Sequence, residues 1–130
     1  MSVAIIRNVY ESFARGDVAS AFKDFHPQIE WREAENYAYA DGNPYIGPDR
    51  ILQGVFARIG ADFEETFKVT PQDFVAEGNT VVTIGRYTGR VKKTGRPIDA
   101  RFAHIWRLEG GKIRSFEQLT DTAQFVNVMK

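Results

Sequence analysis

The sequence contains no cysteine, no long apolar run and no excess of charge of either sign, and each absence removes a class of function. Without cysteine there is no disulfide framework, no thiolate nucleophile and no cysteine-ligated metal. The 17 basic and 17 acidic residues give a formal net charge of zero, which argues against nucleic acid or an anionic membrane as the main partner. No stretch approaches the ~20 apolar residues that span a bilayer, and no secretory signal pattern opens the chain, so a cytoplasmic location is expected.

Histidine is also scarce, because the chain has only His26 and His104. His26 precedes Pro27 at an expected helix end, and two histidines without a spaced set of further ligands predict neither a metal site nor a cofactor. Aromatic residues, in contrast, are abundant: ten Phe, five Tyr and two Trp in 130 residues. They are enough to fill the core of the single domain (1–130) expected at this length and to line a pocket as well.

Helical periodicity dominates the first half of the chain. The three-and-four spacing of apolar residues, with capping and stop residues, predicts helices over residues 2–16, 17–26 and 47–60. Strict alternation over 28–33 predicts a half-buried strand. The segment 34–46 carries three tyrosines and several turn residues, and it is predicted as a long loop that serves as a lid.

Strand patterns dominate the second half. Period-2 alternation and turn residues predict strands over 63–75, 80–91, 101–108 and 113–119, followed by a short helix over 121–129. A proline in the first of these strands indicates an edge strand or a bulge, and two glycines in the second permit strong bending. Helices followed by a strand meander indicate an α+β fold in which a curved sheet wraps the helices.

The last two strands form a hairpin about two adjacent glycines, which reach positive φ without strain. His104 shares a strand face with Phe102 and Trp106, so an ionisable imidazole lies in an aromatic row. Pairing about the turn brings Gln118 and Asp121 back toward His104. A carboxylate and an imidazole in shared apolar surroundings form a common type of acid/base site.

Asp121 and His104 each have two interpretations. Asp121 precedes an apolar-periodic segment, so it is a favoured N-cap, and capping stabilises the charged carboxylate and makes it a poor base. Facing a cavity, the same carboxylate would act as a general base. His104 is either a hydrogen-bonded core residue or a pocket group that passes a proton or stabilises an enolate.

Several short motifs together point to a known family. They are Tyr10–Asp17, Ile29–Trp31, Tyr45–Pro48, Gly85–Gly89, Thr94–Arg96, Ala103–Trp106 and Asp121–Thr122. In their order and spacing they resemble the SnoaL-like proteins of the nuclear transport factor 2-like superfamily, with ketosteroid isomerase and limonene epoxide hydrolase as cousins. The resemblance covers nearly the whole chain.

The resemblance implies a cone-shaped, mainly antiparallel sheet around three N-terminal helices, with a deep apolar pocket inside. It also implies a homodimer formed through the outer face of the sheet. In the polyketide cyclases of the family, an aspartate at the place of Asp121 acts as acid and base, and a histidine at the place of His104 stands in the same pocket. Those enzymes close a ring by an aldol step. Fold analogy alone does not establish catalysis.

The expected substrate-binding side chains combine aromatic surface with a few hydroxyl and amide groups. They are Trp31, Tyr10, Tyr45, Phe102, Trp106, Phe116 and Gln118. Trp31 is expected in the pocket wall, and Tyr10 and Tyr45 are expected to orient a ligand oxygen. The other aromatic residues serve equally well as core, and Gln118 departs from the aromatic residue expected at its place.

Asp99 and Arg101 suggest a different chemistry. Epoxide hydrolases of the superfamily use an Asp-Arg-Asp set, but here the aspartate precedes the arginine, and the pair shares a face opposite His104. A surface salt bridge is the expected role. The leading hypothesis is an isomerase or cyclase that removes a proton next to a carbonyl of a small apolar or aromatic compound. The alternatives are a non-catalytic binding module of the same fold, a structural pocket beside a functional dimer face, or an epoxide-hydrolase-like enzyme.

Overall fold

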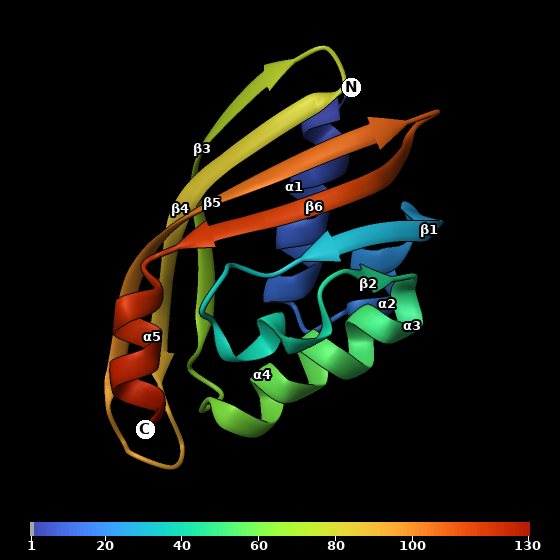
Figure 1. Cartoon of the computed structure of the whole chain (residues 1–130). Coiled ribbons are helices and arrows are strands. Elements are labelled where there is room, and N and C mark those ends of the chain that lie inside the picture. Colours follow the sequence, from blue (N-terminus) through green and yellow to red (C-terminus); the bar gives the residue numbers. More distant parts are fainter. Residues whose placement is uncertain (1) are drawn as a thin grey trace.

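The computed structural model describes residues 2–130 as a curved sheet with helices against its concave side (Figure 1). The helical segments are α1 (Ser2–Ala14), α2 (Val18–Phe22), the 3-10 helix η1 (Ala38–Gly42), α3 (Pro48–Ile51), the π-helical turn η2 (Leu52–Phe56), α4 (Ala57–Asp62) and α5 (Thr122–Met129). The strands are β1 (Phe25–Arg32), β2 (Tyr45–Ile46), β3 (Lys68–Glu77), β4 (Thr80–Arg90), β5 (Pro97–Glu109) and β6 (Lys112–Thr120).

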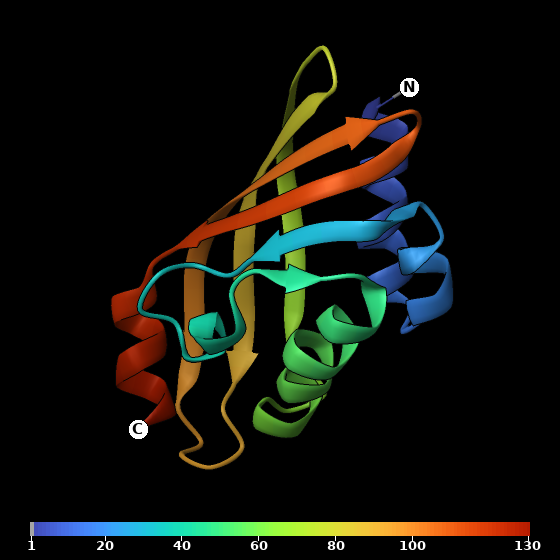
Figure 2. The same ribbon diagram turned by 45° about the vertical axis from the view of Figure 1, so that its right-hand side comes forward.

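These strands form one sheet in the order β2-β1-β6-β5-β4-β3. Neighbours pair antiparallel except β1 and β6, which run parallel. Figure 2 shows α1 and the stretch from α3 to α4 on the concave side, with α5 at the opposite flank. The predicted α+β class, the curved, mainly antiparallel sheet and the N-terminal helices are confirmed.

The first two helices are confirmed, but the second ends earlier than predicted. Asp17 caps α2 as expected, because its side chain accepts a hydrogen bond from the Ser20 amide. The helix stops at Phe22, and the segment around Phe25 and Pro27 belongs to β1. Phe25 pairs with Ile113 of β6, so sheet pairing overrides the local helical spacing.

The third helix begins at Pro48 as predicted, with Gly47 as its N-cap. It runs on through η2 and α4 to Asp62, so the predicted stop at Gly60 is wrong. Gly60 does not have a positive φ and lies inside the last turns of the helix. The helix ends instead where Phe63 adopts an extended conformation and is buried.

The strand meander is confirmed with one shortened strand. Pro71 lies on the edge strand β3, and the register shifts between Pro71 and Asp73, as a bulge requires. The strand predicted from residue 63 begins at Lys68, because Phe63 makes only an isolated bridge to Val91. A Cβ at Gly85 would clash with the Thr70 carbonyl oxygen, so glycine is needed where β3 and β4 bend together.

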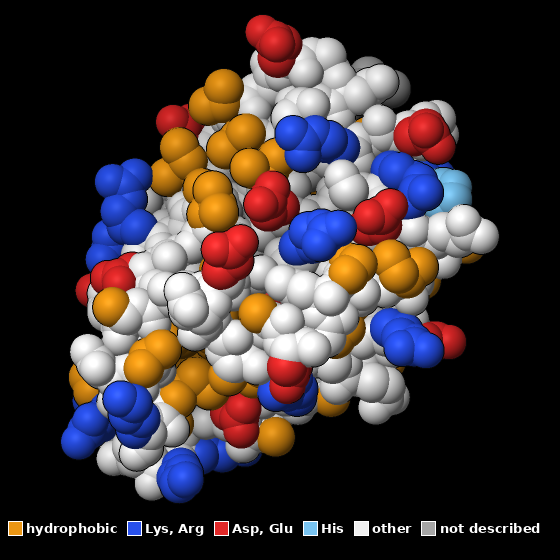
Figure 3. All heavy atoms as spheres, in the orientation of Figure 1, with side chains coloured by type: hydrophobic (Ala, Val, Ile, Leu, Met, Phe, Trp, Pro, Cys, Tyr) orange, Lys and Arg blue, Asp and Glu red, His pale blue; other side chains and the backbone are white. Residues whose placement is uncertain are grey.

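The outer face of the sheet carries an apolar patch. Cross-strand register joins its members, which we call the outer-face patch: Val75, Val82, Ile84, Ala103, Ile105 and Leu119. Val75 and Leu119 are 55% and 49% exposed. Figure 3 shows hydrophobic side chains gathered over β3, β4 and β5 on this face.

Candidate functional site

A cavity of about 60 Å³ lies between the concave face of the sheet and the helices. Its wall is mainly aromatic and aliphatic, and it draws on α1, β1, the third helix, the sheet strands and α5. The polar residues in this wall are Tyr10, Glu33, Tyr37, Tyr87, His104 and Gln118. The cavity therefore presents a few hydrogen-bonding groups in surroundings that are otherwise apolar.

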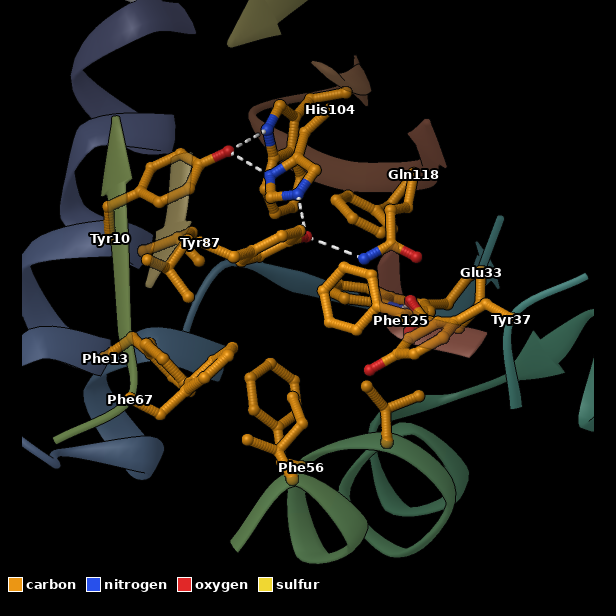
Figure 4. A pocket seen from close by; sticks show the side chains of 18 residues that line it. Tyr10, Phe13, Glu33, Tyr37, Phe56, Phe67, Tyr87, His104, Gln118 and Phe125 are labelled. Atoms are coloured by element: carbon orange, nitrogen blue, oxygen red, sulfur yellow. Dashed lines mark hydrogen bonds between the residues drawn. The ribbon is translucent and has the colours of Figure 1, made fainter. Parts of the chain in front are cut away.

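His104 lies in this wall with both ring nitrogens paired (Figure 4). Its Nδ1 is 2.6 Å from the Tyr10 hydroxyl, and its Nε2 is 2.5 Å from the Tyr87 hydroxyl. Tyr10 comes from α1 and Tyr87 from β4, so the imidazole links the helical layer to the sheet. The predicted neighbour Gln118 is directly opposite His104 in β6, and its Nε2 donates to the Tyr87 hydroxyl at 2.7 Å.

The surroundings of His104 keep its imidazole uncharged. The ring stacks on Phe102 with centroids 3.9 Å apart, as the predicted shared face requires. Burial lowers the pKa of His104 to about 3, because the apolar site disfavours the charged form. Among residues 2–130 no carboxylate is hydrogen-bonded to the ring. At neutral pH this histidine therefore has one N–H and one bare nitrogen.

Glu33 is the carboxylate that lines the cavity. It directly follows β1 and continues the alternation of Ile29 and Trp31, so its side chain turns to the concave side. Trp31 Nε1 donates to Glu33 Oε2 at 2.9 Å, and Asn43 clamps the Glu33 backbone with two hydrogen bonds of 2.8 Å.

Glu33 is only 4% exposed. Burial raises the pKa of its carboxyl to about 7, against the opposing effects of the Trp31 hydrogen bond and the Arg58 charge. A carboxyl group with such a pKa gains and loses a proton near neutral pH, which is the requirement for a general base.

Six of the predicted site residues line the cavity: His104, Trp31, Tyr10, Trp106, Phe116 and Gln118. Phe102 supports the site from behind, through its stack on His104, without lining the cavity. Tyr45 lies elsewhere, against the third helix and η1, and its hydroxyl donates to the Tyr39 carbonyl at 2.6 Å. The structure thus gives Tyr45 a packing position in place of the expected ligand contact.

Asp121 also lies outside the cavity wall. Its exposed side chain caps α5 by accepting hydrogen bonds from the backbone N and the Nε2 of Gln124, at 3.4 and 3.1 Å. The sheet ends with Thr120 paired to Phe102, and the next residue already begins the turn into the helix. The capping interpretation of Asp121 therefore describes its position, and the expected common cavity with His104 is corrected.

The sequence interpretation overlooked Glu33 and Tyr87, although the signals were present. Extending the alternation of the first strand by one more step places Glu33 inward. Tyr87 follows the same rule in β4, where Val81 and Thr83 are buried on the same side. The wall residue Tyr37 comes from a loop, where no period predicts orientation. Phe125 comes from a short helix, whose periodicity predicts burial of this side chain but not that it faces a cavity.

Asp99 and Arg101 do not contribute to the cavity. Asp99 is exposed on the outer face and accepts a 2.8 Å hydrogen bond from Arg86 Nε. The expected surface ion pair therefore forms, but with Arg86 of the adjacent strand in place of Arg101.

Residues 2–130 contain no group of three or more His, Cys, Asp or Glu side chains arranged to hold a metal ion. Within the same range no helix has the length and apolar character needed to cross a membrane.

Known structures share this architecture. An NTF2-like protein from Burkholderia thailandensis is 33% identical, with a TM-score of 0.94 over 99% of this chain and 97% of that one. TerC, co-crystallized with polyporic acid, is 24% identical, with a TM-score of 0.85 over 98% and 97%. The fold is thus that of the nuclear transport factor 2-like proteins.

Sequence comparison assigns the chain to one family within this class of fold. An uncharacterized protein of Mycobacterium tuberculosis is 30% identical over 112 residues, which are 84% of this chain and 80% of that protein. The family model described as a SnoaL-like domain matches residues 6–116. The chain therefore belongs to the SnoaL-like domain family.

Proposed function

We propose that this chain is an acid–base enzyme of the isomerase or cyclase type, which moves a proton at the carbon next to a carbonyl group. The observation that carries the proposal is Glu33, a buried carboxyl group in an apolar cavity whose pKa is raised to about 7. Buried carboxyl groups with such pKa values are concentrated at functional sites. Glu33 takes the role that the sequence interpretation gave to Asp121.

The proposed reaction uses the carboxyl group on one side of the cavity and the hydrogen-bond donors on the other. Glu33 Oε takes the acidic proton, and the electrons of the broken C–H bond move toward the carbonyl oxygen to give an enolate. Hydrogen-bond donors of the wall around Tyr87 and Gln118 stabilise the negative charge on that oxygen. An isomerase then returns the proton from Glu33 to a different carbon. In a cyclase the enolate carbon attacks a second carbonyl, and Glu33 protonates the new alkoxide.

The cavity limits the size of the substrate. Since one water needs ~10–15 Å³ of this volume, about 60 Å³ holds roughly four to six waters. A cavity of about 150 Å³ is known to hold benzene, so a ring-sized substrate requires the aromatic side chains of the wall to move. Phe13, Phe56 and Phe67 line the side formed by α1, the third helix and the segment before β3, where such movement would widen the cavity.

A direct test uses 3-cyclohexenone, whose conversion to the conjugated 2-cyclohexenone is followed by ultraviolet absorbance. In D₂O, proton NMR reports the loss of the α-proton independently of the product. We expect the wild type to catalyse the conversion and Glu33→Gln to lose ~10²–10⁴-fold of the rate. Equal rates for the wild type and Glu33→Gln would reject Glu33 as the base.

The second candidate function is a binding module without catalysis. It is favoured by TerC, a protein of the same fold that was co-crystallized with polyporic acid. The mainly apolar wall serves such a role equally well. Saturable binding of 2-cyclohexenone, with no α-proton exchange in either the wild type or Glu33→Gln, would support this function over the isomerase.

A further inference from the structure

The carboxyl group of Glu33 has one oxygen that accepts no hydrogen bond. Trp31 Nε1 donates to Oε2 at 2.9 Å, whereas Oε1 makes no hydrogen bond within residues 2–130. Glu33 lines the cavity and is only 4% exposed, so this oxygen is largely removed from bulk water. Leaving a carboxylate oxygen without a donor in such a place is unfavourable. A ligand that brings a donor would therefore be stabilised there.

The polar groups near the carboxyl do not provide this donor. Gln118 Nε2 donates to the Tyr87 hydroxyl at 2.7 Å, and Gln118 Oε1 accepts from the Ala34 amide at 3.1 Å. Burial raises the pKa of Tyr37, and the Glu33 charge adds to this effect, so the two side chains are close. The Tyr37 hydroxyl nevertheless makes no hydrogen bond to the carboxyl. Figure 4 shows Glu33, Tyr37 and Gln118 on the same side of the cavity.

Ionised Glu33 also lacks a counter-charge in the cavity. Among the described residues, 2–130, no lysine or arginine lines the wall. The Arg58 charge acts on Glu33, but its guanidinium is bound to Asp41 at 2.8 Å, and the Asp41 side chain is 63% exposed. Burial lowers the pKa of His104 to about 3, so its imidazole carries no charge near neutral pH. A cation in the cavity would thus find one negative charge that is free to pair.

The rest of the wall suits the apolar part of such a cation. Its aromatic side chains include Trp31, Tyr37, Phe56, Tyr87, Phe116 and Phe125. The faces of aromatic rings attract an alkylated ammonium ion, and the attraction is stronger where water is excluded. The cavity therefore combines one carboxylate with an aromatic surface.

The cavity volume limits the cation to a compact one. About 60 Å³ corresponds to roughly four to six water-sized positions. A trimethylammonium ion, with one nitrogen and three carbon atoms, is of this size, so it requires less movement of the wall than a ring-sized ketone. Its single N–H also matches the single free oxygen of Glu33. A primary ammonium group would bury further N–H groups without acceptors.

We propose that the cavity binds a small protonated tertiary amine, whose N–H donates to Glu33 Oε1 and whose alkyl groups lie against the aromatic wall. The ligand provides both the donor and the counter-charge that the carboxylate lacks. Such binding requires only that Glu33 carries its charge, and it involves no chemical step. It is therefore independent of the proposed function.

The affinity for such an ion should depend on pH through Glu33. Burial raises the pKa of this carboxyl to about 7, so roughly a tenth of it is ionised at pH 6 and nine tenths at pH 8. Trimethylammonium is charged at both pH values. Because the ion pairs with the carboxylate form, its affinity should rise about tenfold from pH 6 to pH 8.

The other ionisable groups around Glu33 keep one charge state over this range. Burial raises the pKa of each tyrosine in the wall, which stays neutral: Tyr10, Tyr37 and Tyr87. His104, with its pKa lowered by burial to about 3, is also neutral. Arg58 and Asp41 stay charged, because the hydrogen bond between them raises the pKa of Arg58 and lowers that of Asp41. A change in affinity between pH 6 and pH 8 therefore reports Glu33.

The binding test compares trimethylammonium with 2-propanol by ¹H–¹⁵N NMR titration of the whole chain. The two molecules have equal numbers of non-hydrogen atoms and one donor each, but only the first is charged. We expect trimethylammonium to bind about tenfold more tightly at pH 8 than at pH 6, and 2-propanol to bind weakly and equally at both. Absence of trimethylammonium binding at pH 8, equal affinity at the two pH values, or tighter binding of 2-propanol would each overturn the proposal.

The carboxyl group itself is observed by ¹³C NMR of the Glu33 side chain. Saturating trimethylammonium should lower the pH at which this signal titrates by more than one unit, because a bound cation stabilises the charged form. An unmoved titration midpoint would mean that the ion binds away from the carboxyl, and the proposal would be rejected.

Glu33→Gln removes the charge while keeping the size of the side chain. It should lose at least tenfold in affinity for trimethylammonium at pH 8, together with the pH dependence, and it should keep the 2-propanol affinity of the wild type. Glu35→Gln is the matched control, because Glu35 is exposed and lies outside the cavity wall, and it should bind as the wild type does. Equal trimethylammonium affinity in Glu33→Gln and the wild type would contradict the proposal. If Glu33→Gln lost both ligands, the midpoint shift in the wild type would decide.

These readouts separate ammonium binding from the proposed catalysis. Binding of trimethylammonium that rises with pH, together with equal α-proton exchange in the wild type and Glu33→Gln, would sustain the ammonium site and reject Glu33 as the base. An unmoved Glu33 midpoint, together with a large loss of exchange in Glu33→Gln, would reject the ammonium site and sustain the proposed function.

Discussion

Trp31 Nε1 donates to Glu33 Oε2 at 2.9 Å, and the two side chains come from one face of the same short stretch of chain. This single hydrogen bond stabilises the carboxylate, but removal from water destabilises it more, so the pKa of Glu33 rises to about 7. The protein thus keeps a carboxyl group that is largely protonated in mildly acidic solution and largely charged in mildly alkaline solution.

Glu33→Gln should make the protein more stable than the wild type at alkaline pH. The pKa of Glu33 is about 7 in the folded chain, against 4.5 for an exposed glutamate side chain. The stabilising effect of this raised pKa is complete below pH 4.5 and is lost as the pH rises through 7. Each unit of pKa difference corresponds to about 1.36 kcal/mol, so the wild type loses about 3 kcal/mol of folding stability. Glutamine does not titrate, so Glu33→Gln does not lose this stability.

The measurement is urea denaturation of both proteins at pH 5 and pH 8.5. All other titrating groups are shared, so the difference between the two variants isolates Glu33. The free energy of unfolding of Glu33→Gln relative to the wild type should increase by about 2.5 kcal/mol between these pH values, because part of the full effect has already occurred at pH 5. Parallel profiles would mean that Glu33 titrates normally in the folded protein.

Turnover of 3-cyclohexenone should rise with pH through about 7 and then level off, because only ionised Glu33 accepts the proton. The matched control is Asp121→Asn. Asparagine caps a helix as well as aspartate does, and Asp121 lies outside the cavity wall. Asp121→Asn should therefore keep the stability, the rate and the pH profile of the wild type. A large loss of rate in Asp121→Asn alone would return the base to Asp121.

Local sequence patterns predicted most of the fold, because each pattern depends on a single helix, strand or turn. The cap at Asp17, the bulge at Pro71 and the Gly-Gly hairpin are consequences of backbone chemistry that needs no distant partner. The error at Phe25 has the opposite cause. Its parallel pairing with Ile113 joins residues far apart in the chain, and helical spacing carries no information about it.

The candidate site was predicted in part for the same reason. Alternation along β5 predicted that His104 shares a face with Phe102, and pairing about the Gly-Gly turn predicted that Gln118 returns close to it. In the structure His104 stacks on Phe102, and Gln118 is its direct partner in β6. The position of Asp121 depends on where β6 ends and how the chain leaves the sheet, which alternation does not describe. The identity of the buried carboxylate, Glu33, depends on a strand end that Asn43 clamps from a loop.

Asn43→Ala should weaken both the fold and the site. The Asn43 side chain accepts from the Glu33 backbone N–H and donates to the Glu33 carbonyl, each at 2.8 Å. Removing both bonds should cost ~1–3 kcal/mol in the free energy of unfolding and lower turnover, because Glu33 is no longer held in place. Urea denaturation and the 3-cyclohexenone assay measure the two effects.

Asn127→Ala is the matched control for this variant. Asn127 is exposed on α5, its side chain makes no hydrogen bond within residues 2–130, and its backbone carbonyl accepts one from Arg96. This variant should keep the stability of the wild type within ~0.5 kcal/mol and should keep its turnover. If Asn43→Ala and Asn127→Ala were equally stable and equally active, the clamp on Glu33 would have no energetic role.

We expect the outer-face patch to be buried between the two chains of a homodimer, and Leu119→Glu should dissociate this homodimer. Leu119 is 49% exposed and pairs with Ala103 in the middle of the patch, so a charge there would be desolvated on association. Val126→Glu is the control, because Val126 is a similarly exposed apolar residue, 38% exposed, on α5 outside the patch. Light scattering after size-exclusion chromatography should give twice the mass of one chain for the wild type and Val126→Glu, and a single chain for Leu119→Glu. A wild-type monomer at all concentrations would refute the dimer. An exposed apolar patch indicates an association surface, and only the mass of the assembly shows that a partner covers it.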